Sequence, residues 1–117
     1  AGADDAFRSF GLGYWVPQEN PDTIADGLRA IVGVRNFAVI RDHVRRVFTV
    51  SDSDIREAMA LFWRHLRILI EPSSATVIAA VRNHPEIFAG RKVGAIITGG
   101  NIHPANWLEL TTDSPSV

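Results

Sequence analysis

The stretch GAIITGGN at residues 94–101 decides how this chain is expected to fold. Residues 93–98 form an unbroken apolar run that ends in the hydroxyl of Thr98, and two glycines follow. A continuous apolar run of this length is typical of a parallel β-strand that is covered on both faces. Ligands of such sheets gather at the carboxyl ends of the strands, so Thr98 and the glycines are expected at a ligand-binding edge.

Two helices are expected between this strand and an earlier one. Ser51 and Asp54 form an N-terminal capping pattern, with Asp in place of the usual Glu, and an amphipathic helix follows. The phrase EPSSATVIAAV at 71–81 places Pro72 in a first helical turn, and its small apolar residues favour packing on a sheet. Residues 47–50, VFTV, are β-branched and aromatic, which predicts a short strand.

The other segments carry weaker signals. Residues 36–46 show helical spacing, and residues 23–33 favour a short helix that is interrupted or begun at Gly27. Residues 85–92 are expected to form a turn, and the polar tail 108–117 is expected to be loose. The order strand–helix–helix–strand predicts an α/β fold, and a chain of 117 residues is one domain at most or a piece of one.

Composition excludes several classes of function. The net charge is −1 and the basic residues are mostly scattered, so neither nucleic acid nor an anionic membrane is an expected partner. The absence of cysteine excludes disulfides, thiolate nucleophiles and Cys-ligated zinc. No apolar run is long enough to span a bilayer and no signal peptide opens the chain, so a cytoplasmic protein is expected.

Four sequence motifs follow one another along the chain: PQENPDTIADGL, TVSDSDIREAM, ILIEPSSATVIAAV and IITGGN. Together they resemble the C-terminal third of a fold-type II pyridoxal-phosphate enzyme in the serine/threonine dehydratase and serine racemase family. The resemblance covers residues 1–101 and leans toward the 3-hydroxyaspartate dehydratase branch. It implies the large domain of a tryptophan synthase β-like fold, in which helices pack on parallel strands, and a homodimeric enzyme.

The resemblance implies that Thr98, Gly99, Glu71 and Gly27 contact pyridoxal 5'-phosphate. The hydroxyl of Thr98 would meet the pyridine nitrogen and leave it largely unprotonated, whereas an aspartate would hold a proton there and strengthen the electron sink. The residues by themselves leave simpler interpretations open. Thr98 can cap the following turn, Glu71 can be stabilised as a carboxylate at a helix N-terminus, and Gly27 can serve a helix-starting turn.

The opening AGADD implies, by the same resemblance, a divalent-cation site that uses the carbonyl of Ala3 and the carboxylate of Asp5. Oxygen ligands suit Mg²⁺, Ca²⁺ or Mn²⁺. The glutamate that precedes this motif in relatives is absent from the chain, and Asp5 can equally cap a helix. Asn101 and Arg67 match positions associated with a nucleotide effector in some relatives, although a solvated Arg67 explains the sequence as well.

The family also needs parts that this sequence does not show: a Schiff-base lysine, an asparagine loop and a glycine-rich phosphate loop. Lys92 is the only lysine, and it lies just before the expected strand, at the end opposite Thr98 and separated from it by about 20 Å of extended chain. No catalytic residue is therefore assigned within residues 1–117. The chain is expected to be the C-terminal segment of a longer enzyme, inactive without its N-terminal partner segment.

The complete enzyme would dehydrate and deaminate serine, threonine or 3-hydroxyaspartate to a 2-oxo acid and ammonia, with racemisation of serine as a further activity. A different class of function is left open by the residues. The glycines at 99–100 and the helix start at Ser73 and Ser74 can also hold a phosphate or nucleotide in a non-catalytic α/β binding module, because helix N-termini attract anions.

Overall fold

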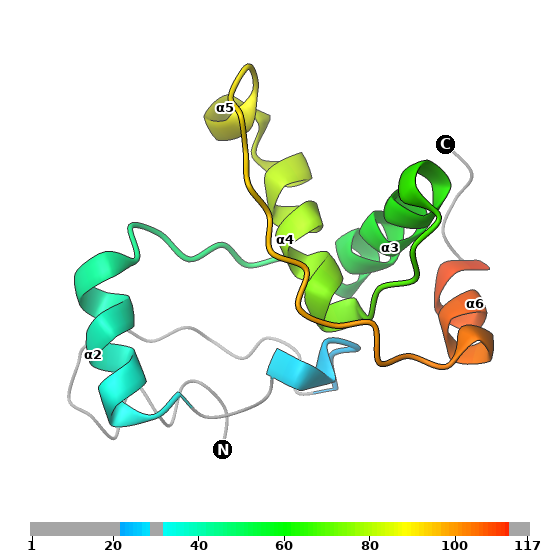
Figure 1. The fold of residues 1–117 in the computed structure, drawn as a ribbon, viewed down its shortest axis with the longest axis horizontal. Helices are drawn as coiled ribbons and strands as arrows, with labels where there is room; N and C mark the ends of the chain where they lie inside the picture. Colours follow the sequence, from blue (N-terminus) through cyan, green and yellow to red (C-terminus); the bar gives the residue numbers. More distant parts are fainter. Residues whose placement is uncertain (1–21, 29–31, 113–117) are drawn as a thin grey trace. The chain divides into compact units, whose positions relative to one another are not determined.

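The computed structural model describes residues 22–28 and 32–112, in two units that divide between Phe48 and Thr49 (Figure 1). The first unit contains a 3₁₀ helix, η1 (Asp26–Leu28), and the helix α2 (Val34–His43). The expected helix over 36–46 is confirmed in position, while the described residues around Gly27, 22–28, contain a 3₁₀ turn. The AGADD motif, with Ala3 and Asp5, lies outside the described residues.

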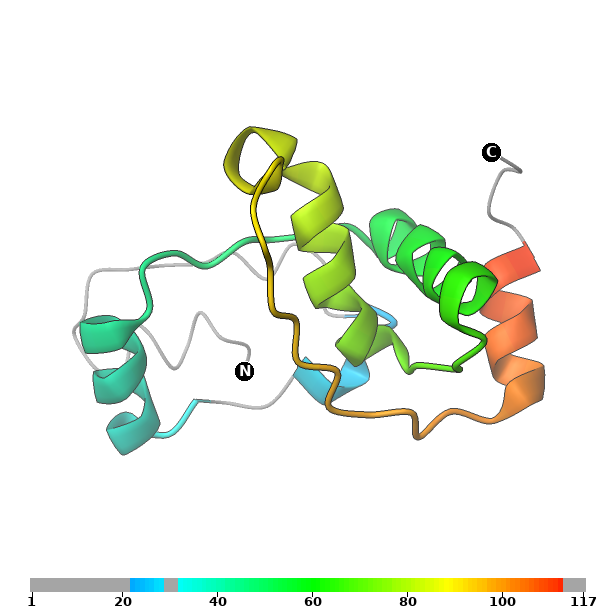
Figure 2. The same ribbon diagram turned by 45° about the horizontal axis from the view of Figure 1, so that its top comes forward.

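The second unit contains four helices among the described residues: α3 (Asp52–Leu66), α4 (Pro72–Asn83), α5 (Pro85–Phe88) and α6 (Pro104–Thr112). Both views place α3 between α4 and α6 (Figures 1 and 2). The core of this unit is apolar: the fully buried side chains include Ile55 and Met59 of α3 and Ile70 of the following loop, and alanines of α3 and α4 fill the contact between the helices.

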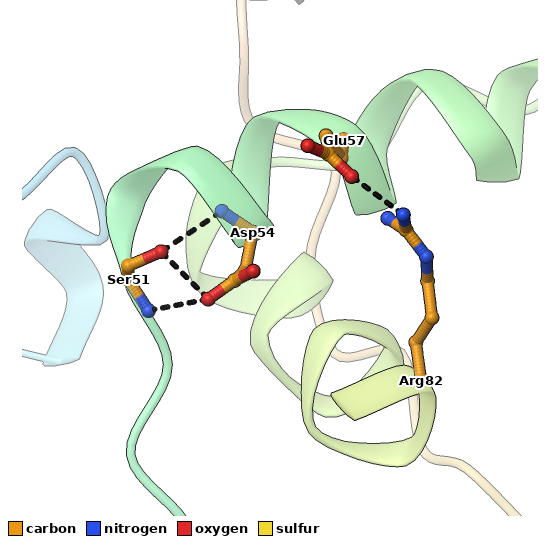
Figure 3. Close-up of polar contacts among 4 residues, drawn as sticks. All are labelled: Ser51, Asp54, Glu57 and Arg82. Carbon is orange, nitrogen blue, oxygen red and sulfur yellow. Dashed lines mark hydrogen bonds and ion pairs between the residues drawn. The ribbon is translucent and has the colours of Figure 1, made fainter. Parts of the chain in front are cut away.

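The start of α3 confirms the capping pattern of the sequence (Figure 3). The Ser51 hydroxyl accepts a hydrogen bond from the Asp54 amide at 3.1 Å, and the Asp54 carboxylate accepts one from the Ser51 amide at 3.0 Å. Two of the amides that a helix start leaves without partners are thereby satisfied. One turn further along, Glu57 pairs with Arg82 of α4 at 2.5 Å and ties the two helices together at the surface.

The predicted strands are not formed: no strand occurs at residues 47–50, at residues 93–98 or elsewhere in the described parts of the chain. Residues 92–103 are non-helical, and the side chain of Ile96 is 81% exposed where the sequence predicts burial on both faces. A strand requires a ladder of backbone hydrogen bonds to a neighbour. The described residues offer this segment a single backbone-to-backbone hydrogen bond from a distant part of the chain, from the amide of Glu71 to the carbonyl of Gly99 at 3.3 Å, so the strands on which the α/β prediction rests are absent from the described residues.

Three further expectations need correction. Residues 85–92 are not merely a turn, since Pro85 occupies the first turn of α5. The tail 108–117 is not loose as far as Thr112, because α6 continues to that residue and is anchored by Trp107, whose side chain is buried against Trp63 with ring centroids 5.8 Å apart. The helix α4 packs on α3 and not on a sheet. No helix within 22–28 or 32–112 combines the length and apolarity that crossing a bilayer demands.

Candidate functional site

The start of α4 determines where the carboxylate of Glu71 lies. Pro72 opens the helix, and the carbonyl of Glu71 accepts hydrogen bonds from the amides of Ser74 and Ala75, both at 3.1 Å. The Glu71 side chain makes no capping bond to this helix. The Glu71 side chain therefore gives α4 no hydrogen-bonded cap, although Glu71 is the N-cap residue, and its carboxylate bonds a different segment.

That segment is the glycine pair. The amide of Gly99 donates to the Ser74 hydroxyl at 2.8 Å, and the amide of Asn101 donates to Oε2 of Glu71 at 3.0 Å. The carbonyl of Gly99 accepts from the amide of Glu71 at 3.3 Å. We call these residues, Glu71, Ser74, Gly99, Gly100 and Asn101, the helix–glycine junction. It joins two stretches of chain that are 25 to 30 residues apart in sequence.

The junction leaves no room for side chains at its two glycines. A Cβ atom at Gly99 would lie 2.5 Å from Oε1 of Glu71, which is shorter than any normal carbon–oxygen contact. A Cβ atom at Gly100 would lie 3.0 Å from the carbonyl oxygen of Leu69. Glycine is favoured at both positions because the chain approaches Glu71 and Leu69 closely, not because of an unusual backbone angle.

Thr98 immediately precedes the junction, and its side chain is exposed. Its hydroxyl makes no hydrogen bond within the described residues, so it does not cap the following turn. A threonine packed among aliphatic side chains would have contradicted a ligand-facing role. The observed hydroxyl is instead held at the end of an extended segment whose next residue, Gly99, is anchored on both its amide and its carbonyl.

A phosphate is a poor occupant of this helix start. The Ser74 side chain is 3% exposed, and its hydroxyl already accepts the Gly99 amide. The carboxylate of Glu71 lies beside the same turn, where its negative charge would repel a phosphate. The geometry therefore argues against a phosphate or nucleotide held by residues 99–100 together with Ser73 and Ser74.

The other candidate residues are not members of the junction, and some of them lie outside the described chain. Arg67 is the C-cap of α3, exposed and in the left-handed conformation with φ 58°, and its amide bonds the carbonyl of Trp63 at 2.9 Å. Gly27 lies in η1 of the first unit. Lys92 is exposed at the start of the extended segment. The parts of the chain described here contain no cluster of acidic and histidine side chains that could hold a metal.

Sequence reasoning missed the role of Ser74. The sequence marks this residue only as part of a helix start that can receive an anion, yet it is the buried polar residue of the described chain and the acceptor of the Gly99 amide. The sequence does place Ser74 three residues after Glu71, in the first turn of the expected helix. A hydroxyl at that position can accept a hydrogen bond from another segment of the chain.

Comparison with known proteins fits this geometry. The family described as pyridoxal-phosphate dependent enzyme matches residues 1–99, which include the exposed Thr98 and the anchored Gly99. The chain belongs to this family. Pyridoxal phosphate is the cofactor of the family, and among its members the chain is similar to a hydroxyaspartate dehydratase, a hydroxyaspartate ammonia-lyase and serine racemases.

Three members illustrate the similarity. The chain is 47% identical over 100 residues to the beta-hydroxyaspartate dehydratase of Paracoccus denitrificans, covering 86% of this chain and 32% of that protein. The crystal structure of serine racemase from Dictyostelium discoideum matches with a TM-score of 0.69 and 39% identity over 86% of this chain and 32% of the other. The processed form of threonine deaminase isoform 2 from Solanum lycopersicum matches with a TM-score of 0.72 and 27% identity, covering 94% of this chain and 33% of the other.

These structural neighbours are fold-type II pyridoxal-phosphate enzymes. The chain spans about a third of the length of the curated relatives that it matches. About two thirds of such an enzyme is not represented in this sequence, including residues that could contact the non-helical segment at 93–98.

Proposed function

We propose that this chain is the C-terminal part of a pyridoxal-phosphate-dependent ammonia-lyase. The complete protein would eliminate water from a β-hydroxy amino acid, namely 3-hydroxyaspartate, serine or threonine, and the resulting enamine would then take up water and release ammonia and a 2-oxo acid. Relatives named as a hydroxyaspartate dehydratase, a serine racemase and a threonine deaminase support this class. The observation that carries the proposal is the exposed Thr98 hydroxyl held by the helix–glycine junction.

The residues of the junction fit the cofactor. Gly99 and Gly100 carry no side chain, and the Cβ side of each faces Glu71 or the carbonyl of Leu69, so a flat aromatic ring would approach their backbone from the other side. The Thr98 hydroxyl is free among the described residues to donate a hydrogen bond to a ring nitrogen. When bound, pyridoxal phosphate supplies an electron sink for bond breaking at the substrate's Cα.

Thr98 would tune that sink because its hydroxyl is neutral. A hydroxyl donates a proton in a hydrogen bond without transferring it, so the ring nitrogen stays largely unprotonated. The weaker sink favours prompt departure of the β-hydroxyl of the substrate. Glu71 does not supply the missing charge, because its carboxylate is engaged by the amide of Asn101. We propose that Glu71 contacts the cofactor next to Gly99 and Gly100, the residues that its side chain adjoins.

The rest of the enzyme would supply the lysine and the phosphate loop. The finer features of the proposal rest on sequence motifs: a cofactor contact at Gly27, a divalent cation at Ala3 and Asp5, a nucleotide effector near Asn101 and Arg67, and a homodimer. Assays of the complete protein with and without Mg²⁺ and a nucleotide test the cation and effector sites. No change in rate with either addition would remove those two features from the proposal.

The test of the main proposal is a Thr98 series in the complete protein, assayed for 2-oxo acid release from the three amino acids. We expect Thr98→Ser to retain activity and Thr98→Val to lose about fivefold or more, since a lost hydrogen bond costs about 1 kcal/mol. We expect Thr98→Asp to protonate the ring nitrogen, which a pH titration of the cofactor absorbance detects. If Thr98→Val and Thr98→Asp both match the unaltered protein in rate and absorbance, the proposal is wrong.

A further inference from the structure

The hydroxyl of Ser74 has an unusual hydrogen-bond partner for a residue inside a helix. A serine or threonine inside a helix commonly bonds a carbonyl of its own helix, as Thr76 does with the carbonyl of Ser73 at 2.8 Å. The Ser74 hydroxyl instead accepts the amide of Gly99, 25 residues away in sequence, at 2.8 Å. Ser74 is only 3% exposed and the bond is part-buried, so loss of the hydroxyl removes the protein partner of an amide with limited access to water.

This bond also constrains the residue before Gly99. A peptide unit is planar, so the amide of Gly99 and the Cα and carbonyl of Thr98 lie in one plane. An acceptor that fixes the direction of the Gly99 amide therefore fixes the orientation of the Thr98 end of that unit. On the other side, the amide of Glu71 holds the Gly99 carbonyl at 3.3 Å, and the Glu71 carboxylate holds the Asn101 amide at 3.0 Å.

We propose that Ser74 is a positioning residue for Thr98: by accepting the Gly99 amide it sets the place at which the Thr98 hydroxyl meets the cofactor. This inference rests on the proposed function of Thr98. Ser74 itself touches neither cofactor nor substrate. Removal of its hydroxyl leaves the part-buried Gly99 amide without its protein acceptor, so the glycine segment loses the bond that fixes it against the start of α4.

The experiment compares three variants of the complete protein. Ser74→Ala removes the acceptor, and Ser74→Thr keeps a hydroxyl at the same position. Thr76→Val is the matched control, because it removes a hydroxyl bond from the same helix without touching the glycine segment. The first readout is amide hydrogen exchange of residues 98–101 in the cofactor-free protein. We expect about tenfold faster exchange in Ser74→Ala, and rates within about twofold of the unaltered protein in the other two variants.

The second readout is the absorbance and fluorescence of the bound cofactor across pH, measured beside Thr98→Val and the double variant Ser74→Ala, Thr98→Val. We expect Ser74→Ala to shift the spectrum in the direction that Thr98→Val does. The double variant should match Thr98→Val alone, because a misplaced hydroxyl and a missing one lose the same contact. Ser74→Thr should restore the spectrum of the unaltered protein.

The outcomes separate the two proposals. Unchanged exchange at residues 98–101 in Ser74→Ala overturns the role of Ser74. Faster exchange with an unaltered cofactor spectrum, while Thr98→Val changes that spectrum, also overturns it and leaves Ser74 a purely structural residue. If Thr98→Val leaves the spectrum unchanged, the proposed function fails, and the positioning role fails with it.

Discussion

At the scale of single residues, Gly99 lies so close to Glu71 that a side chain there would clash. Its φ angle is not in the left-handed region, so the backbone itself would accept any L-amino acid. The restriction comes from the carboxylate of Glu71, 2.5 Å from where a Cβ would stand. That carboxylate is not free to swing aside without cost, because it accepts the amide of Asn101. Close approach of two distant segments therefore explains the glycine.

We predict that Gly99→Ala displaces the Glu71 carboxylate and breaks its bond to Asn101. In the complete protein the affinity for pyridoxal phosphate should fall about tenfold, in line with the loss of a hydrogen bond to a charged group. Gly94→Ala is the control, since a Cβ at Gly94 meets nothing within 4 Å in the described chain. Fluorescence titration of the cofactor measures both variants. Equal affinities for the two would contradict the close approach at Gly99.

At the scale of elements, α3 owes its start to a local motif. The Ser51 hydroxyl bonds the carboxylate of Asp54 at 2.6 Å as well as its amide, and this bond is the largest cause that lowers the pKa of Asp54. A carboxyl group with a lowered pKa in the folded state stabilises the fold above its unfolded pKa of about 3.9. That stabilisation is lost as the pH falls through the lower, folded pKa.

We predict that Ser51→Ala weakens the first turn of α3 by about 1 kcal/mol, which is about fivefold in local hydrogen exchange. The matched control is Ser53→Ala, since Ser53 is exposed on the same turn and takes no part in the capping box. Exchange of the peptide over residues 52–59 at about pH 6, above the unfolded pKa of a carboxyl group, measures the difference. A carboxyl-group NMR titration should find the pKa of Asp54 raised in Ser51→Ala. Unchanged exchange together with an unchanged pKa would contradict a stabilising cap.

At the scale of the whole molecule, the chain exposes apolar side chains that a complete enzyme would be expected to cover. They include Ile68 at 53% and Ile96 at 81% exposure, the latter on the extended segment that leads to Thr98. Backbone groups of that segment also lack a neighbouring strand among the described residues. The relatives are about three times as long as the matched region, so these surfaces are suited to contact with the remaining part of such an enzyme.

We predict that the isolated 117-residue chain forms no stoichiometric covalent adduct between Lys92 and pyridoxal phosphate. Lys92 begins the extended segment that Thr98 ends, so the lysine and the proposed ring contact are separated by up to about 20 Å of chain. Borohydride reduction followed by peptide mass spectrometry detects any labelled lysine. The complete protein, treated in parallel, should be labelled at a lysine outside this sequence. A stable label that Lys92→Ala abolishes would overturn the prediction.

Local motifs were readable from the sequence because the interacting residues are neighbours in the chain. Ser51 and Asp54 are three residues apart, and their capping box formed as expected. Pro72 begins α4, where the amide that proline lacks would have no partner within the helix. The order of four short phrases was enough to indicate the pyridoxal-phosphate family, which the match over residues 1–99 confirms. Each of these inferences needs only the chemistry of adjacent residues or the order of motifs.

The tertiary structure decided what depends on residues far apart. The apolar run at 93–98 predicted a covered strand, but a strand exists only where a neighbour supplies hydrogen bonds, and the described residues supply too few. The sequence also left open whether Glu71 caps its own helix. Its carboxylate turns to the Asn101 amide, and Ser74 accepts the Gly99 amide, because folding brings the glycine pair against the start of α4. The residues in these contacts are 25 and 30 positions apart, so a pattern of adjacent residues cannot predict them.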